Sequence, residues 1–357
     1  MAKSRPVRGA TSNAVSGRLR SLGVDHDGDW LDERESLDGV PLPLRTTVTV
    51  ERPRTIISRN ASPDMSFDRS INPYRGCEHG CIYCYARPSH AFHDLSPGLD
   101  FESRLFAKPD AAALLRRELA RPGYLPAPIA LGTNTDPYQP IEREWGITRE
   151  VIAVLAECRH PLTITTKSDR VVRDIDLLAP MAAQGLASVC VSVTSLDPKI
   201  ATTIEPRAPH PEKRLAAVRK LADAGVPVYV SIAPVIPAIT DHEIEHLVER
   251  AAGAGASAAF FIPVRLPHEV APLFKSWLDE HFPDRAGKVM STIRSMRGGR
   301  ENDPGFFTRL RGSGPWAQLL GARFDIACRR HGLNGRRITL RSDLFRPPAG
   351  PQGELFG

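Results

Sequence analysis

The sequence has 357 residues, of which 41% are hydrophobic and 25% charged, and its formal net charge is +6. This composition is typical of a globular protein with a sizeable core, and it excludes a fibrous or wholly disordered chain. The longest apolar run, residues 226–239, contains three prolines and is too short to cross a bilayer. The basic N-terminus lacks the apolar stretch of a secretory signal, so we expect a cytoplasmic protein without a membrane span.

Strand and helix patterns alternate along most of the chain, after residues 1–45, whose low apolar periodicity predicts a flexible segment. The apolar and β-branched runs predict strands at 70–74, 128–133, 162–166, 187–193, 226–232 and 258–264. Helices are predicted at 109–120, 148–158, from 168, at 211–224 and at 240–254. Thr148 is expected to cap the second of these helices, and Thr240 with Glu243 to form a capping box.

This alternation predicts right-handed βα units around a parallel sheet. Six units are too few for an eightfold barrel, which leaves a partial barrel or an open doubly wound sheet. In both folds, function is expected at the C-terminal ends of the strands. Residues 46–266 are therefore interpreted as one core domain.

The chain changes character from about residue 267, where it becomes Arg-rich and largely helical. Residues 285–346 hold fourteen Lys or Arg and four Asp or Glu, a net charge of +10. A short strand is expected at 337–340, after an Asn334-Gly335 turn. We interpret 267–346 as a basic extension packed on the core, and 347–357 as a flexible tail.

Three of the six cysteines, Cys77, Cys81 and Cys84, fall within eight residues at a C-x3-C-x2-C spacing. Gly76 and Gly80 give this segment the backbone freedom to wrap a small inorganic group. A four-iron cluster usually has four thiolate ligands, so three would leave one iron open. The amino and carboxylate groups of S-adenosylmethionine (SAM) can chelate that iron, and an electron from the cluster can then release a 5′-deoxyadenosyl radical.

The alternative is a structural zinc ion, with His79, His90 or His93 as the fourth ligand. The sequence has no second C-x2-C pair, which zinc sites of this kind usually have. A redox-active disulfide is a further, weaker interpretation.

The cysteine motif carries Tyr83 in its aromatic position, follows a predicted strand and resembles the radical SAM superfamily. The segments SINPYRGCEHGCIYCYARPSH, GTNTDPYQPIER, TTKSD and SLDPKIATTIEPRAPHPEKRL resemble the branch related to spore photoproduct lyase, the DNA-repair-photolyase-like proteins. The resemblance covers about residues 50–345. It implies a partial (β/α)6 barrel, a [4Fe–4S] cluster, SAM, and lyase or nucleic-acid repair or modification chemistry.

Polar residues that follow the predicted strands are candidates for binding SAM. Asn134 and Asp136 suit its ammonium group or ribose, Lys167 and Arg207 its carboxylate, and Ser192 and Thr194 its hydroxyls. The resemblance implies that the backbone of Tyr83 contacts adenine, and that Lys167 and Ser192 occupy cofactor-binding positions. However, TNTD replaces the usual Gly-Gly-Glu stretch of the superfamily. Each of these side chains is alternatively a rim hydrogen bond, and Glu205 and Arg207 a scaffolding pair.

Cys158, Cys190 and Cys328 lie in helix or strand patterns, as buried packing residues do. Photoproduct lyases return a hydrogen atom through a cysteine between the second and third strands. Cys158 lies in this interval, but its helical pattern indicates the core. The sequence therefore does not support that particular reaction.

The leading hypothesis is a radical enzyme that acts on nucleic acid through residues 285–346 and needs an electron donor for its cluster. The tail residues Gln352, Leu355 and Phe356 resemble the peptide that binds the bacterial sliding clamp; a disordered tail is the alternative. Two other hypotheses are a radical enzyme for a peptide or small metabolite and a non-catalytic, metal-stabilised nucleic-acid-binding module. The sequence does not define the substrate, the fate of SAM or the oligomeric state.

Overall fold

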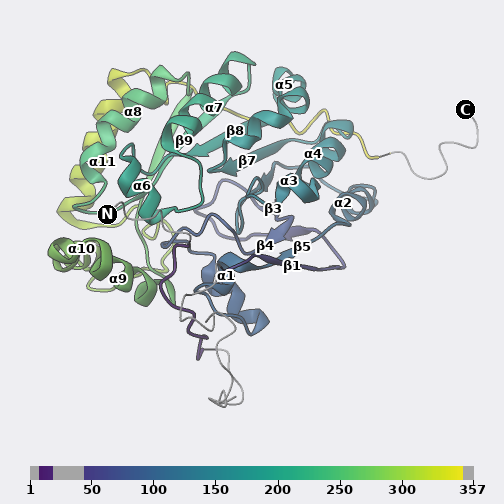
Figure 1. The fold of residues 1–357 in the computed structure, drawn as a ribbon. Helices are drawn as coiled ribbons and strands as arrows, with labels where there is room; N and C mark the ends of the chain where they lie inside the picture. Colours follow the sequence, from purple (N-terminus) through teal and green to yellow (C-terminus); the bar gives the residue numbers. More distant parts are fainter. Residues whose placement is uncertain (1–7, 19–43, 349–357) are drawn as a thin grey trace, which may run out of the picture.

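A computed structural model describes residues 8–18 and 44–348, which are built around one seven-stranded sheet (Figure 1). The strands, in spatial order, are β10 (Ala258–Pro263), β9 (Val228–Val235), β8 (Ala187–Ser192), β7 (Leu162–Thr166), β6 (Ile129–Leu131), β3 (Arg69–Ile71) and β2 (Ile57–Arg59). Every neighbouring pair is parallel except β2 and β3. The six parallel strands confirm the expected partial (β/α)6 barrel.

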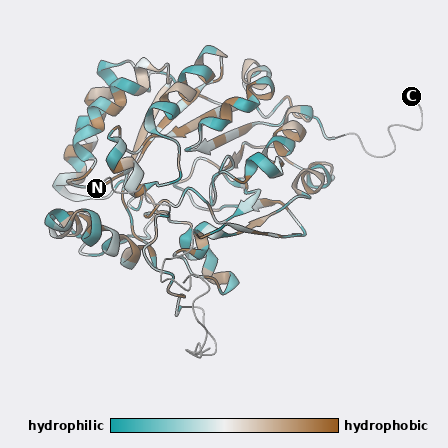
Figure 2. Cartoon of the chain, in the orientation of Figure 1, coloured by the Kyte–Doolittle hydropathy of each residue, from teal (hydrophilic) through white to brown (hydrophobic). Residues whose placement is uncertain are grey.

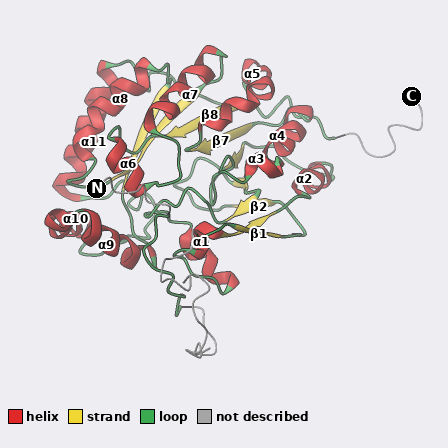
Figure 3. Ribbon diagram, viewed as in Figure 1, coloured by secondary structure: helices red, strands yellow, loops and turns green. Residues whose placement is uncertain are grey.

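Helices cover the outer face of this sheet (Figure 3). They are α2 (Ala111–Leu119), α4 (Ile147–Glu157), α5 (Ile175–Ala183), α7 (Pro211–Asp223), α8 (Ile244–Gly253) and α11 (Gly314–Arg330). The strands present apolar side chains such as Val189 and Val191 to the main core, while Cys190 and Ser192 alternate with them on the inner face. Hydrophobic residues are concentrated along the central strands, and the outward helix faces are hydrophilic (Figure 2).

Short elements complete the upper end of the barrel, where the parallel strands end. The 3-10 segments are η1 (Arg87–His93), η2 (Asp169–Asp174) and η3 (Asp241–Glu243), and the short helices are α1 (Asp100–Ser103), α3 (Glu142–Trp145) and α6 (Pro198–Ile204). A second sheet contains β1 (Thr47–Val50), β5 (Arg104–Ala107) and β4 (Tyr74–Arg75). This small sheet lies where the chain leaves β3, and it positions the cysteine segment that follows β4.

The C-terminal part is helical, as expected, with α9 (Val270–His281) and α10 (Pro283–Ser295) preceding α11. After α11 the chain crosses the lower ends of four strands in turn. The Asn334 side chain hydrogen-bonds both backbone groups of Ala259 at 3.0 Å, and the Arg341 amide donates to Gly185 just before β8. Residues 334–346 therefore close the end of the barrel opposite the cysteine segment.

Some local predictions were wrong. Thr148 lies inside α4, and its hydroxyl donates to Pro137 rather than capping the helix. Thr240 and Glu243 form no capping box, because Glu243 accepts hydrogen bonds from Ser195 and Leu196 after β8. Residues 337–340 form no strand. Among the described helices, none is long and apolar enough to cross a membrane.

Residues 8–18 differ from the flexible segment expected there, because they lie against the cysteine segment and α1. Asn13 and Asp100 exchange hydrogen bonds through the Asn13 amide and the Asp100 carboxylate and backbone, and Arg18 pairs with Glu269 at 3.1 Å. The remainder of the expected segment lies outside the described residues, apart from residues 44 and 45.

Candidate active site

The cysteine segment is a loop between β4 and η1 at the upper end of the barrel. Two glycines let it turn: Gly76 has φ +73° and Gly80 has φ +67°, in the left-handed region that favours glycine. A Cβ on Gly76 would lie 2.8 Å from the carbonyl oxygen of Phe101, and one on Gly80 would lie 2.8 Å from Glu102. The backbone amide of Cys77 donates to Phe101, which ties the loop to α1.

A fully buried arginine organises the inner side of this loop. The Arg87 guanidinium donates to the carbonyls of Gly80 and Cys81 and to two carbonyls before α1. It also forms an ion pair with Glu102 at 2.5 Å, and both side chains have no exposed surface. Because a buried charge needs such partners, this pair holds the loop in one shape. Sequence reasoning missed both residues, although Arg87 lies within a segment that carries the family resemblance.

Residues 8–18 cover the outer side of the same loop. The amides of Gly9 and Ala10 donate to the Glu102 carboxylate at 2.9 and 2.8 Å. A Cβ on Gly9 would lie only 1.8 Å from the carbonyl oxygen of Gly80, so only glycine fits this contact. Glu102 thus binds the N-terminal segment and Arg87 at once.

The three thiols fit a shared inorganic ligand. Cys77 and Cys81 are buried, Cys84 is partly exposed, and all three are free of disulfide bonds. Burial raises the pKa of Cys77 well above its ordinary value and that of Cys81 to about 12. Neutral buried thiols of this kind ionise when a metal takes the place of the proton.

The histidines named for a zinc site have other neighbours. His79 Nδ1 lies 3.3 Å from the Asp136 carboxylate, and His90 Nε2 hydrogen-bonds Arg104 at 2.9 Å. Across residues 8–18 and 44–348, no three His, Cys, Asp or Glu side chains are grouped to hold a single metal ion. A cluster differs in this respect, because its cysteines bind different iron atoms.

Asp136 is a structural link between two strand ends. Its carboxylate accepts hydrogen bonds from the Thr166 hydroxyl at 2.6 Å and from the Lys167 amide at 2.7 Å. Burial would raise the pKa of Asp136, but His79 and these hydrogen bonds outweigh it and lower the pKa to about 2. The carboxylate therefore stays ionised, and it fixes the backbone from which the Lys167 side chain extends.

Lys167 lies between the cysteine loop and the strand ends. Its ammonium is 5.8 Å from the centre of the Tyr83 ring, and its side chain forms no hydrogen bond or ion pair with any described residue. Burial would lower the pKa of Lys167, but the thiolate form of Cys81 and the carboxylates of Glu205 and Asp136 outweigh that effect and raise the pKa. Lys167 therefore stays protonated, and its ammonium is available to an anionic ligand.

Glu205 is the centre of a buried polar group that the sequence did not indicate. It accepts hydrogen bonds from the hydroxyls of Tyr83 and Thr194, and it pairs with Arg214 at 2.5 Å. Burial would raise the pKa of Glu205, but Arg214 and Lys167 outweigh it and lower the pKa. The predicted Glu205–Arg207 pair is therefore wrong, because Glu205 pairs with Arg214 on the following helix.

The other predicted SAM-binding residues lie in different settings. Arg207 pairs with Glu78 at 2.9 Å, beside the cysteine loop. The Ser192 side chain is buried at the end of β8 and has no hydrogen-bond partner among the described residues. Asn134 is exposed after β6, and its backbone N–H donates to the Asn72 side-chain oxygen. The seven predicted residues thus lie at the upper end, but Asp136 and Thr194 are largely satisfied by protein groups.

Two of the remaining cysteines, Cys158 and Cys328, fit the packing role expected for them, whereas Cys190 belongs to no hydrophobic cluster of the described residues. Cys158 and Cys328 lie in the main core, where burial raises the pKa of each to about 11. Cys190 faces the barrel interior from β8, and burial raises its pKa to about 12.

A partial barrel with a three-cysteine loop at its mouth is the arrangement of enzymes that bind an iron–sulfur cluster there, and comparison with known families agrees. A model of the radical SAM superfamily matches residues 71–251, and the chain belongs to that superfamily. It is a radical SAM enzyme, whose family uses a [4Fe–4S] cluster and SAM. When bound, these cofactors supply a 5′-deoxyadenosyl radical that removes hydrogen from a substrate.

Its relatives include an uncharacterized protein of Mycobacterium tuberculosis, 37% identical over 232 residues, which are 64% of this chain and 68% of the relative. An uncharacterized protein of Methanocaldococcus jannaschii is 27% identical over 215 residues, 60% of this chain and 76% of the relative. Among solved structures, spore photoproduct lyase complexed with dinucleoside spore photoproduct has a TM-score of 0.57 at 18% identity, covering 80% of this chain and 79% of the lyase. That likeness shows a shared fold.

Proposed function

We propose that this radical SAM enzyme acts on nucleic acid, in repair or modification. The observation that supports it is a set of cations in and near the segment that follows β10 that have no carboxylate within 4.0 Å among the described residues: Arg265, Arg300 and Arg311. Of these, Arg265 lies over the ring of Tyr85, which directly follows Cys84. Phosphate groups are the abundant anions that such a surface would neutralise. The fold shared with a lyase that was solved in complex with dinucleoside spore photoproduct supports the same class of substrate.

The basic extension divides into two parts. Of the fourteen basic residues at 285–346, Arg297 is buried and four others pair with carboxylates. The remaining exposed cations include Arg300 and Arg311 beside β10, but also Arg329 and Arg330 at the lower end of α11. Only the first pair lies in the segment that Arg297 fixes to the C-terminal end of β10, so we assign nucleic-acid contact to that part.

In this proposal the chain's residues have distinct roles. Cys77, Cys81 and Cys84 hold the cluster, and Lys167 binds the carboxylate of SAM. Asp136 acts through the backbone of Lys167 and orients it. Tyr83, Asn134, Ser192, Thr194 and Arg207 lie around the same space as further SAM contacts. Residues 8–18 shield the outer side of the cysteine loop from water.

Neutralising charge at each end of the molecule tests the substrate class. We expect Arg300→Gln/Arg311→Gln to lower the slope of log affinity against log salt by about 1 to 2, because each lost phosphate contact removes about 0.9. The variant Arg329→Gln/Arg330→Gln is the matched control and should keep the wild-type slope. Fluorescence anisotropy with a labelled oligonucleotide over a salt series measures both. Equal slopes in all three proteins would contradict the proposed surface.

Deuterium transfer identifies the reacting substrate. An oligonucleotide deuterated on its sugars or on its thymine methyl groups should pass deuterium into 5′-deoxyadenosine, whereas deuterated peptides should not. Deuterium transfer from peptides and not from oligonucleotides would contradict a nucleic-acid substrate and favour a peptide substrate. The electron donor for the cluster is part of the same proposal and can be replaced by dithionite here.

The sliding clamp remains a proposed partner. Gln352, Leu355 and Phe356 lie outside the described residues, so their sequence alone supports it. A clamp pull-down with the full chain should lose retention in Leu355→Ala/Phe356→Ala. Equal retention of both proteins would reject this partner.

A further inference from the structure

One loop spans the open side of the barrel. β2 and β10 are the two edge strands of the sheet, and the outer edge of each pairs with no other strand among the described residues. Residues 298–313 link these two edges. Arg297, at the start of this loop, donates to two carbonyls at the end of β10 at 3.1 and 2.8 Å. Arg309 forks the carboxylate of Asp64, between β2 and β3, at 2.7 and 2.6 Å. The loop is therefore fixed at both sides of the gap.

The tip of this loop presents two adjacent phenylalanines to solvent. Phe306 is 51% exposed and Phe307 is 63% exposed. Phe307 has φ +67°, a left-handed conformation that is costly for a bulky residue. Its amide donates to Asp64 at 3.2 Å, so the anchor that fixes the loop also holds this conformation. Neighbouring large apolar side chains on a rigid support mark a binding surface.

Arginines accompany these aromatic rings. Arg309 lies over the ring of Phe306 at 5.0 Å, and Arg265 lies over Tyr85 at 5.0 Å. Tyr85 directly follows Cys84 and is 47% exposed. Burial lowers the pKa of Arg265, and the charges of Arg309 and Asp64 are close enough to affect it as well. Rings and cations thus extend from the loop tip to the cysteine loop.

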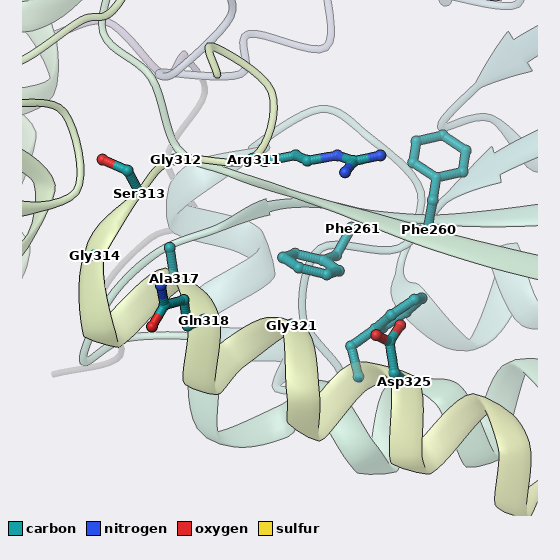
Figure 4. Close-up of a pocket in the computed structure, with 11 residues that line it drawn as sticks. Phe260, Phe261, Arg311, Gly312, Ser313, Gly314, Ala317, Gln318, Gly321 and Asp325 are labelled. Carbon is teal, nitrogen blue, oxygen red and sulfur yellow. The ribbon is translucent and has the colours of Figure 1, made fainter. Parts of the chain in front are cut away.

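A hollow of ≈ 620 Å³ lies on the other side of the loop, between β10 and α11. Figure 4 shows the Arg311 guanidinium extending toward the Phe260 ring. Phe260 lies on the edge strand β10 and is 39% exposed. The same combination of ring and guanidinium therefore occurs on both sides of the loop.

We propose that Phe306 and Phe307 form an aromatic wedge that enters the base stack of a nucleic acid, in place of a base that turns toward the barrel. This inference rests on the proposed function. Apolar wedges separate base steps in this way, and they offset part of the cost of removing a base from the stack. Arg300 and Arg311 belong to the same loop, Arg265 lies over Tyr85, and none of the three has a carboxylate within 4.0 Å among the described residues. These cations favour a polyanion over an apolar protein surface or a second copy of this chain.

The test uses the full chain with its reconstituted cluster and a short duplex that carries 2-aminopurine beside a mismatch. Wild type should bind it and raise the 2-aminopurine fluorescence, because the probe loses its stacking. Phe306→Ala/Phe307→Ala should bind about tenfold more weakly or worse and lose the fluorescence rise, with the salt slope unchanged. Phe306→Trp/Phe307→Trp should retain both signals. Ile326→Ala is the control, since Ile326 is 54% exposed on α11 and remote from the loop.

Full affinity and full fluorescence rise in the double alanine variant would overturn the wedge and leave nucleic-acid binding intact. A monomer–dimer shift in that variant, seen by light scattering without a change in affinity, would also overturn it in favour of a second copy. If wild type itself fails to bind any oligonucleotide, the proposed function falls as well. Formation of 5′-deoxyadenosine without substrate should be equal in all variants, which confirms that their radical sites are intact.

Discussion

Individual side chains at the mouth have either structural or ligand-directed roles, and their hydrogen bonds separate the two. The side-chain oxygens of Asp136 and Thr194 form hydrogen bonds with protein groups, whereas the Lys167 ammonium has no protein acceptor among the described residues. A half-buried cation without an acceptor is best stabilised by an anionic ligand. Lys167 is therefore the side chain at which loss of SAM binding is easiest to measure.

We expect Lys167→Met to weaken SAM binding by about 10- to 100-fold, because a hydrogen bond to a charged group contributes about 1.5–3 kcal/mol. Equilibrium dialysis with SAM on the reconstituted protein measures the affinity. Arg170→Met removes a neighbouring exposed cation and should leave the affinity unchanged. An unaltered affinity in Lys167→Met would remove this residue from the SAM site.

The position of these residues could be predicted from the sequence, but their partners could not. Strand ends were visible as polar residues after apolar runs, and parallel strands bring those residues to one end of the barrel. The direction and the partner of each side chain depend on tertiary packing. Glu205 illustrates this, because the nearest arginine in sequence is Arg207 and the one that it binds is Arg214.

At the scale of elements, the cysteine loop depends on neighbours that form no part of its motif. Arg87 on η1 and Glu102 on α1 are a buried ion pair whose removal on one side leaves an uncompensated charge. The C-x3-C-x2-C spacing indicates what the loop binds. The shape of the loop comes from this pair and from the two glycines with positive φ.

Arg87→Met should destabilise the protein by about 3–5 kcal/mol and reduce iron per protein, because Glu102 and four carbonyls lose their donor. Urea unfolding and iron analysis measure the two effects. Arg104→Met is the matched control, since Arg104 is 59% exposed and its change should cost about 0.5 kcal/mol or less. Equal iron content and stability in both variants would show that the pair does not shape the loop.

The bounds of the strands rich in β-branched residues were predicted closely, because a run of such residues indicates a strand that is buried in the sheet. Residues 162–166 form β7 at the predicted bounds. Capping predictions were wrong where the capping side chain binds a tertiary partner instead. Glu243 is an example, because its carboxylate accepts hydrogen bonds from Ser195 and Leu196. The turn predicted at Asn334 is present, with φ +65°, but residues 337–340 do not form the strand predicted after it, because the Asn334 side chain binds the edge of β10 and the chain continues under the barrel.

For the molecule as a whole, an aromatic cluster ties the C-terminal segment to the lower end of the barrel. The Phe345 ring packs against Tyr124 and His160 at centroid distances of 5.4 Å. His160 Nδ1 lies 3.0 Å from Pro161 O and its Nε2 lies 2.9 Å from the Tyr124 hydroxyl, an arrangement that suits the neutral ring. Burial lowers the pKa of His160 to about 4.

This histidine makes stability depend on pH. Its folded pKa is below the unfolded value of about 6.5, so its stabilisation is complete above pH 6.5 and is lost as pH falls toward 4. The loss at pH 5 should be about 2 kcal/mol. Urea unfolding at pH 7.5 and pH 5 measures it, with His160→Gln as the comparison. A pH difference of the same size in both proteins would assign the effect to other groups.

The segment that crosses beneath β10, β9, β8 and β7 has a consequence for the kinetics of the enzyme. Because this segment closes the lower end and residues 298–313 span the open side, molecules reach the inner side chains from the mouth side. A ligand bound deep against Lys167 is then covered by a substrate that occupies the mouth. Cofactor and substrate should follow a compulsory order, with the cofactor entering first and leaving last.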